Sequence, residues 1–403
     1  MNPIENEALA VVDGLEALTK STSGDLGSID AGTRRKLSEA ARRLSLATEA
    51  TGDTIVRTIL SPLQLPLTLV GVETRLFEFL AQQEGKAAKV AELASMTKVD
   101  VVLMRRLLRY YQSFGMVDQL AEDQYLANNI TSALALPAGR AAVFFYSEAM
   151  VPALNALPQF LRDTGYSNIA DKANCPWSLG HQTDKQFFEW IKERPNVLSH
   201  FMPWISNQRD GLPIFLDAID FKKEFASQGV NESTPVFVDI GGAAGHQCVA
   251  LRQKHPDLIG RVILQDREEV IQEVETRPIP GFEGIITQSY DFFTPQPVEG
   301  ARAYYLRQIL HDWPDIECIE ILKNIKSAMA PESRILLDEM VVPESGAHWR
   351  TTQMDLAMGS VLAGMERSQA EWESLLDKAN LKIMKIWRYG GQLDDCVIVA
   401  AQK

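Results

Sequence analysis

The sequence predicts an α/β fold, with a Rossmann-like domain behind a mainly helical N-terminal region. From about residue 235, short β-branched runs alternate with helical stretches, a pattern typical of a mainly parallel sheet with helices on its faces. The preceding residues instead carry helical periodicity. With 403 residues, the chain is long enough for two domains, or for one large domain with an appendage.

The composition excludes some classes of protein. A net charge of −13 argues against sequence-independent nucleic-acid binding, which needs clustered Lys and Arg. The four cysteines lie far apart and form no CxxC pair, so we expect free thiols in a reducing compartment. The acidic N-terminus lacks the features of a signal peptide, and we expect no apolar run near the roughly 20 residues that span a bilayer. The sequence therefore predicts a cytoplasmic protein with no membrane partner.

Residues 1–60 are expected to form helices without a compact core of their own. A polar break at 21–25 separates two helical patterns. Asp30 or Thr33 is placed to cap the second helix, which should continue through Leu44 and Leu46. Amphipathic helices of this kind often pack on a partner subunit.

Residues 61–140 show a winged-helix pattern. Helical stretches, the longest at 100–112, precede two short strand patterns at 114–118 and 123–127. One interpretation is DNA recognition by the long helix; the other is a structural or dimerisation domain. Three arginines form the only basic cluster there (Arg105, Arg106 and Arg109), and the chain is acidic, so dimerisation is favoured.

Residues 141–230 are predicted to be mostly helical and are rich in Met and aromatic residues. Most of these side chains should belong to the core. A subset, Met202 among them, could line a flat apolar pocket, because Met and aromatic side chains adapt to planar ligands.

Residues 231–403 should form the sheet. Strand-like runs begin near 236, 261, 284, 303 and 334, and a last one near 396 closes the domain. In such folds the ligand site lies at the carboxyl ends of the strands.

A glycine loop follows the first of these strands. Gly241 and Gly242 are adjacent, unlike the glycines of G-x-G-x-x-G, and Asp239 precedes them. Asp266 ends the next strand, where a carboxylate can accept hydrogen bonds from both ribose hydroxyls. A carboxylate at the depth of Asp239 suits a cofactor that carries a cation better than one that carries a pyrophosphate, which disfavours NAD.

His311 is the candidate general base. It lies in the segment Leu310–Asp315, after an apolar strand, and Pro314-Asp315 can open a helix. Two acids, Glu339 and Glu366, lie near other strand or loop ends, and either could fix the ring tautomer and raise its basicity. Metal binding is disfavoured because one histidine and scattered acids lack a recognisable ligand spacing.

These motifs, taken together, resemble the plant and fungal small-molecule O-methyltransferases of the caffeate/flavonoid type, which depend on S-adenosylmethionine (SAM). The resemblance covers roughly residues 60–400 and implies a class I methyltransferase domain. It implies cofactor binding by Asp239, Gly241, Gly242, Gly245, Asp266, Asp291, Phe292 and Arg307. It implies catalysis by His311, Glu339 and Glu366, and a substrate pocket lined by Met202, Asp312, Trp313 and Met358. No metal is implied.

The chain departs from the family pattern at two places. Ala243 stands where a third glycine is usual, so the loop could lie differently against the cofactor. The residues Arg267-Glu268-Glu269 replace the usual Leu-Pro after Asp266, so a residue that commonly packs on adenine is missing.

The reaction that the resemblance implies is methylation of a hydroxyl, most simply a phenol of an aromatic secondary metabolite, with His311 as the base. A first alternative keeps the fold and cofactor but catalyses a non-methylating, pericyclase-type step. A second is a non-enzymatic binding protein with a winged helix. The resemblance also implies a homodimer built through the N-terminal helices and the winged-helix region.

Overall fold

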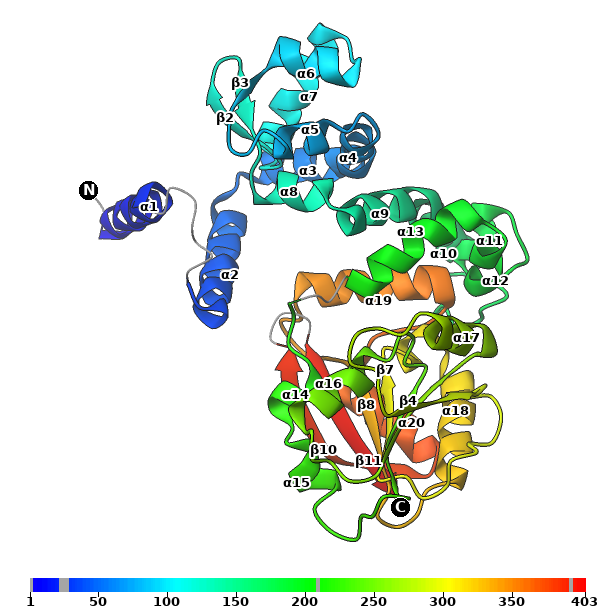
Figure 1. Ribbon diagram of the computed structural model, residues 1–403. Coiled ribbons are helices and arrows are strands. Elements are labelled where there is room, and N and C mark those ends of the chain that lie inside the picture. Colours follow the sequence, from blue (N-terminus) through cyan, green and yellow to red (C-terminus); the bar gives the residue numbers. More distant parts are fainter. Residues whose placement is uncertain (1–2, 22–28, 208–210, 391–393) are drawn as a thin grey trace. The chain divides into compact units, whose positions relative to one another are not determined.

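The computed structural model describes residues 3–21, 29–207, 211–390 and 394–403 (Figure 1). The chain divides into two compact units, Met1–Gln64 and Leu65–Lys403. The predicted α/β fold, preceded by a mainly helical N-terminal region, is confirmed.

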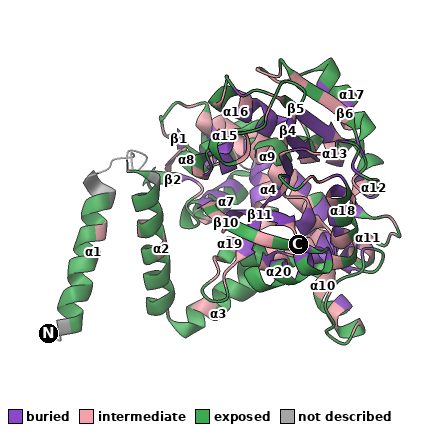
Figure 2. Ribbon diagram, turned by 90° about the horizontal axis from the view of Figure 1, so that it is seen from below, coloured by how far each residue is buried: buried purple, intermediate pink, exposed green. Residues whose placement is uncertain are grey.

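The first unit consists of helices with little burial. It contains α1 (Pro3–Ser21), α2 (Ala31–Thr48), α3 (Thr51–Leu60) and the short turn η2 (Ser61–Leu63). Asp30 is the cap of α2, since its side chain accepts a hydrogen bond of 3.0 Å from the backbone N–H of Thr33. None of the α3 residues is buried, and α1 and α2 are almost entirely exposed in Figure 2.

One stretch of the described chain corrects a sequence prediction. The helical residues Thr51–Glu73 are, by length and composition alone, long and apolar enough to cross a membrane. The expectation that no run approaches this length was wrong, because helical residues and apolar positions continue from α3 through the 3₁₀ turn η2, which contains Pro62, into the next helix. Only 17% of the most apolar part is buried.

The second unit begins with helices around a small antiparallel sheet. Its helices are α4 (Gln64–Glu73), α5 (Leu76–Ala81), α6 (Val90–Thr97), α7 (Val101–Ser113) and α8 (Asn129–Ala135). The strands β1 (Ala88–Lys89), β2 (Asp118–Ala121) and β3 (Gln124–Leu126) pair in the order β1-β3-β2. The strand expected at 114–118 is β2, which begins only at Asp118, because Phe114 ends α7 and Gly115 turns the chain with φ 67°.

A helical layer follows, with an aromatic core. Its elements are α9 (Pro137–Phe145), the π-helical turn η3 (Tyr146–Met150), α10 (Val151–Asp163), α11 (Pro176–His181), α12 (Phe187–Lys192), α13 (Pro195–Asn207), α14 (Phe215–Ala218) and α15 (Phe221–Phe225). Phe145, Trp177, Phe187 and Trp190 are buried together, which confirms that much of the aromatic stretch is core.

The large sheet has the strand order β10-β11-β8-β7-β4-β5-β6. Strands β4 (Pro235–Ile240), β5 (Arg261–Asp266), β6 (Ile285–Ser289), β7 (Ala303–Arg307) and β8 (Arg334–Val342) pair in parallel. β11 (Asp395–Gln402) and β10 (Leu381–Gly390) are antiparallel, and the short β9 (Arg367–Ser368) pairs with β8. The strand β10 was not predicted.

Helices cover both faces of this sheet (Figure 1). α18 (Asp315–Ser327) and α20 (Gln369–Lys378) bury their apolar sides against one face. α16 (His246–Lys254) and α17 (Glu268–Thr276) pack on the other, with α14 and α15. The strands between these layers are the most deeply buried part of the unit (Figure 2).

The order of the strands locates the site. β4 lies between β5 and β7, so the chain runs to one side through β5 and β6 and to the other through β7 and β8. Ligands of open α/β sheets bind at such a switch point, beyond the carboxyl ends of the strands. The glycine loop follows β4 there, and the His311 segment follows β7. α19 (Trp349–Leu362) contacts the His311 turn.

Candidate active site

The candidate base lies on a tight turn just beyond the sheet. β7 ends at Arg307, Gln308 has a left-handed φ of 54°, and Leu310–Asp312 form the 3₁₀ turn η4. The backbone N–H of Gln308 donates to the carbonyl of Asp338 at 3.1 Å. His311 was expected at the strand end, and the structure places it four residues beyond Arg307, on this turn.

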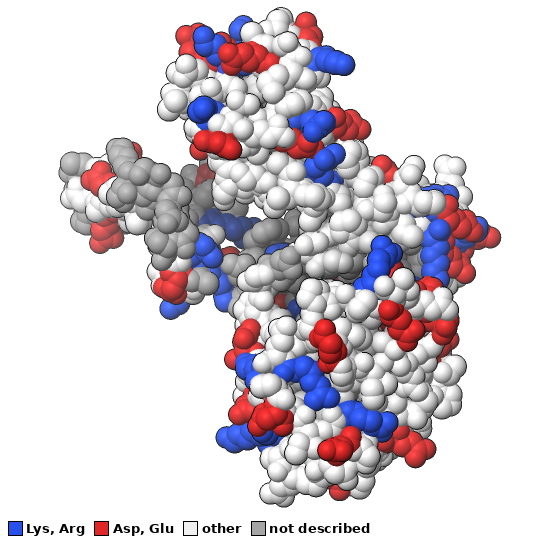
Figure 3. Space-filling view, in the orientation of Figure 1, with Lys and Arg blue, Asp and Glu red and all other residues white. Residues whose placement is uncertain are grey.

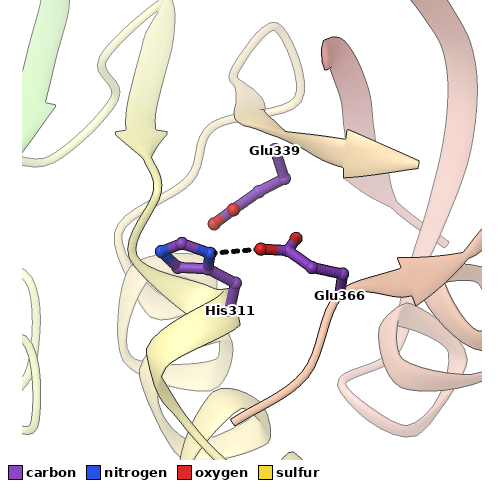
Figure 4. A group of neighbouring side chains, drawn as sticks. All are labelled: His311, Glu339 and Glu366. Carbon is purple, nitrogen blue, oxygen red and sulfur yellow. Dashed lines mark hydrogen bonds and ion pairs between the residues drawn. The ribbon is translucent and has the colours of Figure 1, made fainter. Parts of the chain in front are cut away.

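Glu366 holds the imidazole ring of His311. Its Oε1 lies 2.7 Å from His311 Nδ1 (Figure 4), and His311 is 7% exposed. With the Nδ1 proton donated to Glu366, Nε2 is the basic nitrogen. Asp312 Oδ1 lies 3.3 Å from Nε2. Burial alone would lower the pKa of His311, but the carboxylates of Glu366 and Asp312 outweigh it and raise that pKa to about 10.

Glu339 acts on the turn rather than directly on the ring. Its Oε1 accepts hydrogen bonds from the backbone N–H groups of Ile309, at 3.0 Å, and Leu310, at 2.8 Å. The residue was expected near a strand end, but it lies inside β8, where it is fully buried. Burial raises the pKa of Glu339 to about 7, in spite of the opposing effect of His311. Glu339 therefore fixes the backbone that carries the base.

The approach of Glu366 to His311 depends on a glycine that the sequence analysis missed. A Cβ atom on Gly364 would lie 2.0 Å from the carbonyl oxygen of His311, so a side chain there would push the two segments apart. Met365 N–H donates to that carbonyl at 3.0 Å, and Asp355 accepts from the N–H of Glu366 at 2.9 Å. The position of Gly364, two residues before Glu366, could have indicated this close approach.

Arg367 is a second missed residue. Its fully buried guanidinium donates to the carbonyls of Leu310, at 3.1 Å, and Trp313, at 3.0 Å, and to Asp315 at 2.9 Å. A buried arginine that binds both ends of a turn fixes it in one conformation. Its place directly after Glu366 could have suggested this.

The glycine loop takes the conformation that its sequence requires. Gly241 and Gly245 have φ values of 71° and 80°, and a Cβ on Gly242 would lie 2.5 Å from the carboxyl carbon of Asp239. Ala243, which replaces the usual glycine, also adopts a left-handed φ of 48°. Its N–H donates to Asp266 Oδ2 at 2.9 Å. Ala243 therefore adopts a backbone conformation that favours glycine.

Asp239 is a buried carboxylate near the loop. It is 2% exposed, and Cys248 Sγ lies 3.6 Å from its Oδ2. Burial raises the pKa of Asp239 to about 7. A buried carboxylate without a strong ion pair suits a cationic ligand, which would favour its charged form. The donor set therefore fits a cofactor that carries positive charge, as SAM does.

The residues predicted to flank the adenine form an aromatic group. Phe292 and Phe293 contact Trp313 edge to face, with ring centroids 5.8 and 4.7 Å apart. The ammonium of the buried Lys172 lies 3.3 Å from the centroid of the Trp313 ring. Trp313, expected in the substrate pocket, thus lies beside the segment expected to flank the cofactor.

A cavity of about 730 Å³ opens at the switch point. Of the predicted site residues, Asp239, Gly241, Gly242, Arg307 and Met202 line it. Gly245, Asp266, Asp291, Phe292, His311 and Met358 are outside its lining. Met358 instead packs against the aromatic core of the helical layer.

The surface of the sheet domain carries charges of both signs. On the face shown in Figure 3, acidic and basic side chains lie next to one another over the sheet domain. The negative net charge is therefore dispersed on that face, as expected of a surface that keeps a protein in solution.

Three buried side chains could hold a metal by number and distance. One ligand atom each from His311, Glu339 and Glu366 lies within 4.8 Å of the others. Two of these groups already have protein partners, as Glu366 binds the ring and Glu339 binds the backbone. The expectation of no metal stays a prediction.

The fold and site define a Rossmann-like group-transfer enzyme with a buried histidine–glutamate pair beside a glycine loop. Residues 180–382 match the family model of the O-methyltransferase domain. The chain is 38% identical to O-methyltransferase lepI of Aspergillus flavus, over 88% of this chain and 91% of that one. It is 32% identical to demethylsterigmatocystin 6-O-methyltransferase of Aspergillus parasiticus, over 92% and 93%.

Solved structures of related proteins have the same fold as this chain. A structure of LepI in complex with SAM has a TM-score of 0.89 at 35% identity and covers 99% of this chain and 100% of that one. OxaC in complex with sinefungin and meleagrin has a TM-score of 0.81 at 27% identity and covers 97% and 98%. The chain belongs to the O-methyltransferase domain family. It is a SAM-dependent O-methyltransferase that acts on a small molecule.

Proposed function

We propose that this enzyme methylates a phenolic hydroxyl of an aromatic secondary metabolite, with His311 as the general base. The observation that supports this most strongly is the 2.7 Å contact between His311 Nδ1 and Glu366 Oε1 in a buried site. When the ring is deprotonated, this contact fixes the tautomer whose Nε2 can accept a proton. A base matters here because a phenol has a pKa of about 10 and is neutral at physiological pH.

The residues of the chain have distinct parts in this proposal. His311 Nε2 takes the hydroxyl proton, and Glu366 stabilises the imidazolium that forms. Asp312, at 3.3 Å from Nε2, adds to that stabilisation. Glu339 and Arg367 keep the turn in place. The burial of His311 limits water near the reacting oxygen, which strengthens the electrostatic interactions there.

The proposed cofactor site consists of Asp239, Gly241, Gly242, Gly245, Asp266, Asp291, Phe292 and Arg307. When bound, SAM supplies an electrophilic sulfonium methyl group. Asp266 and Asp291 lie at or after the ends of β5 and β6, where the ribose and adenine are proposed to bind. The proposed substrate-lining residues are Met202, Asp312, Trp313 and Met358, of which Met202 lines the cavity.

A second function stays open because a similar structure is described as "A Pericyclic Reaction enzyme", at 35% identity and a TM-score of 0.89. In that case SAM would be bound without being consumed. The chain's buried base and its acid partner favour methylation, since a reaction that uses only the charge of SAM needs no base at that position.

The test is a turnover assay of the purified protein with SAM and a panel of phenols. Methylation predicts S-adenosylhomocysteine (SAH) and a product heavier by one methylene, in equal amounts. An acceptor converted to an isomer with no SAH formed would instead support the pericyclase alternative.

We further propose that the enzyme is a cytosolic homodimer. Its interface would be formed by residues 1–60 and the winged-helix region 61–140. Within each subunit, residues 141–230 would line the substrate pocket and residues 231–403 would bind SAM. The support for the dimer is an exposed apolar side on α3 and η2: Ile55, Val56, Ile59, Leu60 and Leu63. The four free, buried thiols fit a reducing compartment. Sedimentation at micromolar concentration should give a dimer, and a monomer would contradict the proposal.

A further inference from the structure

Two glutamine side chains in the cavity each have one amide atom without a hydrogen-bond partner in the part of the chain that the structure describes. In one glutamine this atom is a donor, and in the other it is an acceptor. Gln308 Nε2 is a buried donor and Gln247 Oε1 a buried acceptor, and neither has a hydrogen-bond partner among the described residues. Both residues line the cavity that Asp239 and Arg307 also line. Buried polar groups in folded proteins are normally satisfied, so an orphaned pair in one cavity indicates a ligand that supplies the missing partners.

The backbone at Gln308 is also strained. Its φ of 54° is left-handed, a conformation that glycine adopts without strain. The carbonyl of Asp338 and the carboxylate of Glu339 hold this segment through the N–H groups of Gln308 and its two successors. Strained positions of this kind gather at functional sites, where a side chain must be held in a particular place.

Gln247 lines the same cavity from a different element. It is the second residue of α16, directly after the glycine loop, and is 8% exposed. Asp239 precedes the same loop and is also buried. The cavity therefore offers an amide donor from the β7 side, and an amide acceptor and a carboxylate from the β4 side.

This arrangement matches an α-amino acid, whose carboxylate accepts hydrogen bonds and whose ammonium donates them. The residues proposed for the ribose and adenine, Asp266, Asp291 and Phe292, do not line this cavity. The remaining part of SAM, its methionyl group, is therefore the part that would occupy this cavity. We propose that Gln308 and Gln247 recognise the methionyl zwitterion of SAM, Gln308 by donating to its carboxylate and Gln247 by accepting from its ammonium. The inference rests on the proposed cofactor site.

The experiment compares two ligands by isothermal titration calorimetry. SAH carries the amino acid group, whereas 5′-methylthioadenosine retains the adenosine and lacks that group. Gln308→Leu and Gln247→Leu should each weaken SAH binding roughly 10- to 100-fold, as expected for a lost hydrogen bond to a charged group, and change the binding of 5′-methylthioadenosine less than about twofold.

Two further variants separate recognition from folding. Gln308→Gly removes the side chain but relieves the left-handed strain, so it should fold at least as well as wild type and still lose affinity for SAH alone. Gln272→Leu removes an exposed amide on α17, bonded to Glu268, and should change neither affinity.

Equal losses for both ligands, or no loss for SAH in Gln308→Gly, would overturn the inference while leaving the cofactor site intact. A wild-type protein that binds neither ligand would overturn the cofactor site and this inference together.

Discussion

Glu366 Oε1 lies 2.7 Å from His311 Nδ1, and both side chains are buried (Figure 4). The two residues are far apart in the sequence and come together because Gly364 lets its segment pass against the carbonyl of His311. This contact decides which nitrogen of the ring can accept a proton and how strongly.

Replacing Glu366 by Gln should separate two effects of this carboxylate, the orientation of the His311 ring and the electrostatic effect of its negative charge. The amide oxygen can still accept from Nδ1–H, so the ring keeps its place, but the loss of the negative charge lowers the pKa of His311. We expect the limiting kcat at high pH, where His311 is deprotonated, to fall by roughly tenfold or more, and the pH dependence of kcat/KM to shift to lower pH. A rate and pH profile equal to those of wild type would show that the contact has no catalytic role.

The pH dependence of the wild-type enzyme should be steep. With the pKa of His311 raised to about 10, from an ordinary value of 6.5, little free base exists at neutral pH. kcat/KM should therefore rise about tenfold per pH unit above neutrality and level off only near pH 10. A plateau beginning near pH 6.5 would contradict the raised pKa.

The same shift has a consequence for stability. The folded protein binds the His311 proton more tightly than the unfolded chain, so the stabilisation is complete below pH 6.5 and is lost as pH rises through about 10. Thermal denaturation between pH 7 and 10 should show a larger fall in Tm for wild type than for His311→Asn.

Glu339 should behave as a structural acceptor. Glu339→Gln keeps an oxygen for the N–H groups of Ile309 and Leu310 and should leave stability within about 1 kcal/mol of wild type. Glu339→Leu leaves both donors buried without a partner and should cost roughly 2–4 kcal/mol. Urea denaturation of the two variants measures the difference; equal losses would show that these hydrogen bonds do not matter.

Ala243 offers a test of backbone strain. Because its φ is 48°, Ala243→Gly should raise the free energy of unfolding by roughly 0.5–1 kcal/mol. Ala244, whose φ is not in the left-handed range, is the matched control, and Ala244→Gly should lower it. A destabilised Ala243→Gly protein would mean that the alanine side chain contributes more than the strain costs.

Removal of metal ions should have no effect. The three potential ligands already bind one another or the backbone, so dialysis against EDTA should leave kcat unchanged. Loss of activity that Zn²⁺ or Mn²⁺ restores would reassign these residues to a metal site.

Much of the fold could be predicted because its signals are local. The β-branched runs identify the parallel strands, and the adjacent glycines with Asp239 and Asp266 mark the carboxyl ends of β4 and β5. β10 was missed because it lies at the edge of the sheet, where Lys382, Lys385 and Arg388 interrupt its apolar pattern, and its register is irregular.

The details of the site depend on contacts between distant segments. Nothing in the apolar run around Glu339 indicates that its carboxylate binds the backbone of another turn. The clamp by Arg367 and the left-handed φ of Gln308 likewise arise only when β7, β8 and the segment before β9 come together. Periodicity in the sequence carries no information about these contacts.

The most direct test of His311 as the base is how the rate of methyl transfer depends on the acidity of the acceptor hydroxyl. The rates of methyl transfer by wild type and His311→Ala should be compared over phenols with pKa values from about 7 to about 10. We expect a loss of roughly 10²- to 10⁴-fold for the least acidic phenols, and a steadily smaller loss for the more acidic ones, which ionise without help. An equal loss for every phenol, or none, would contradict it.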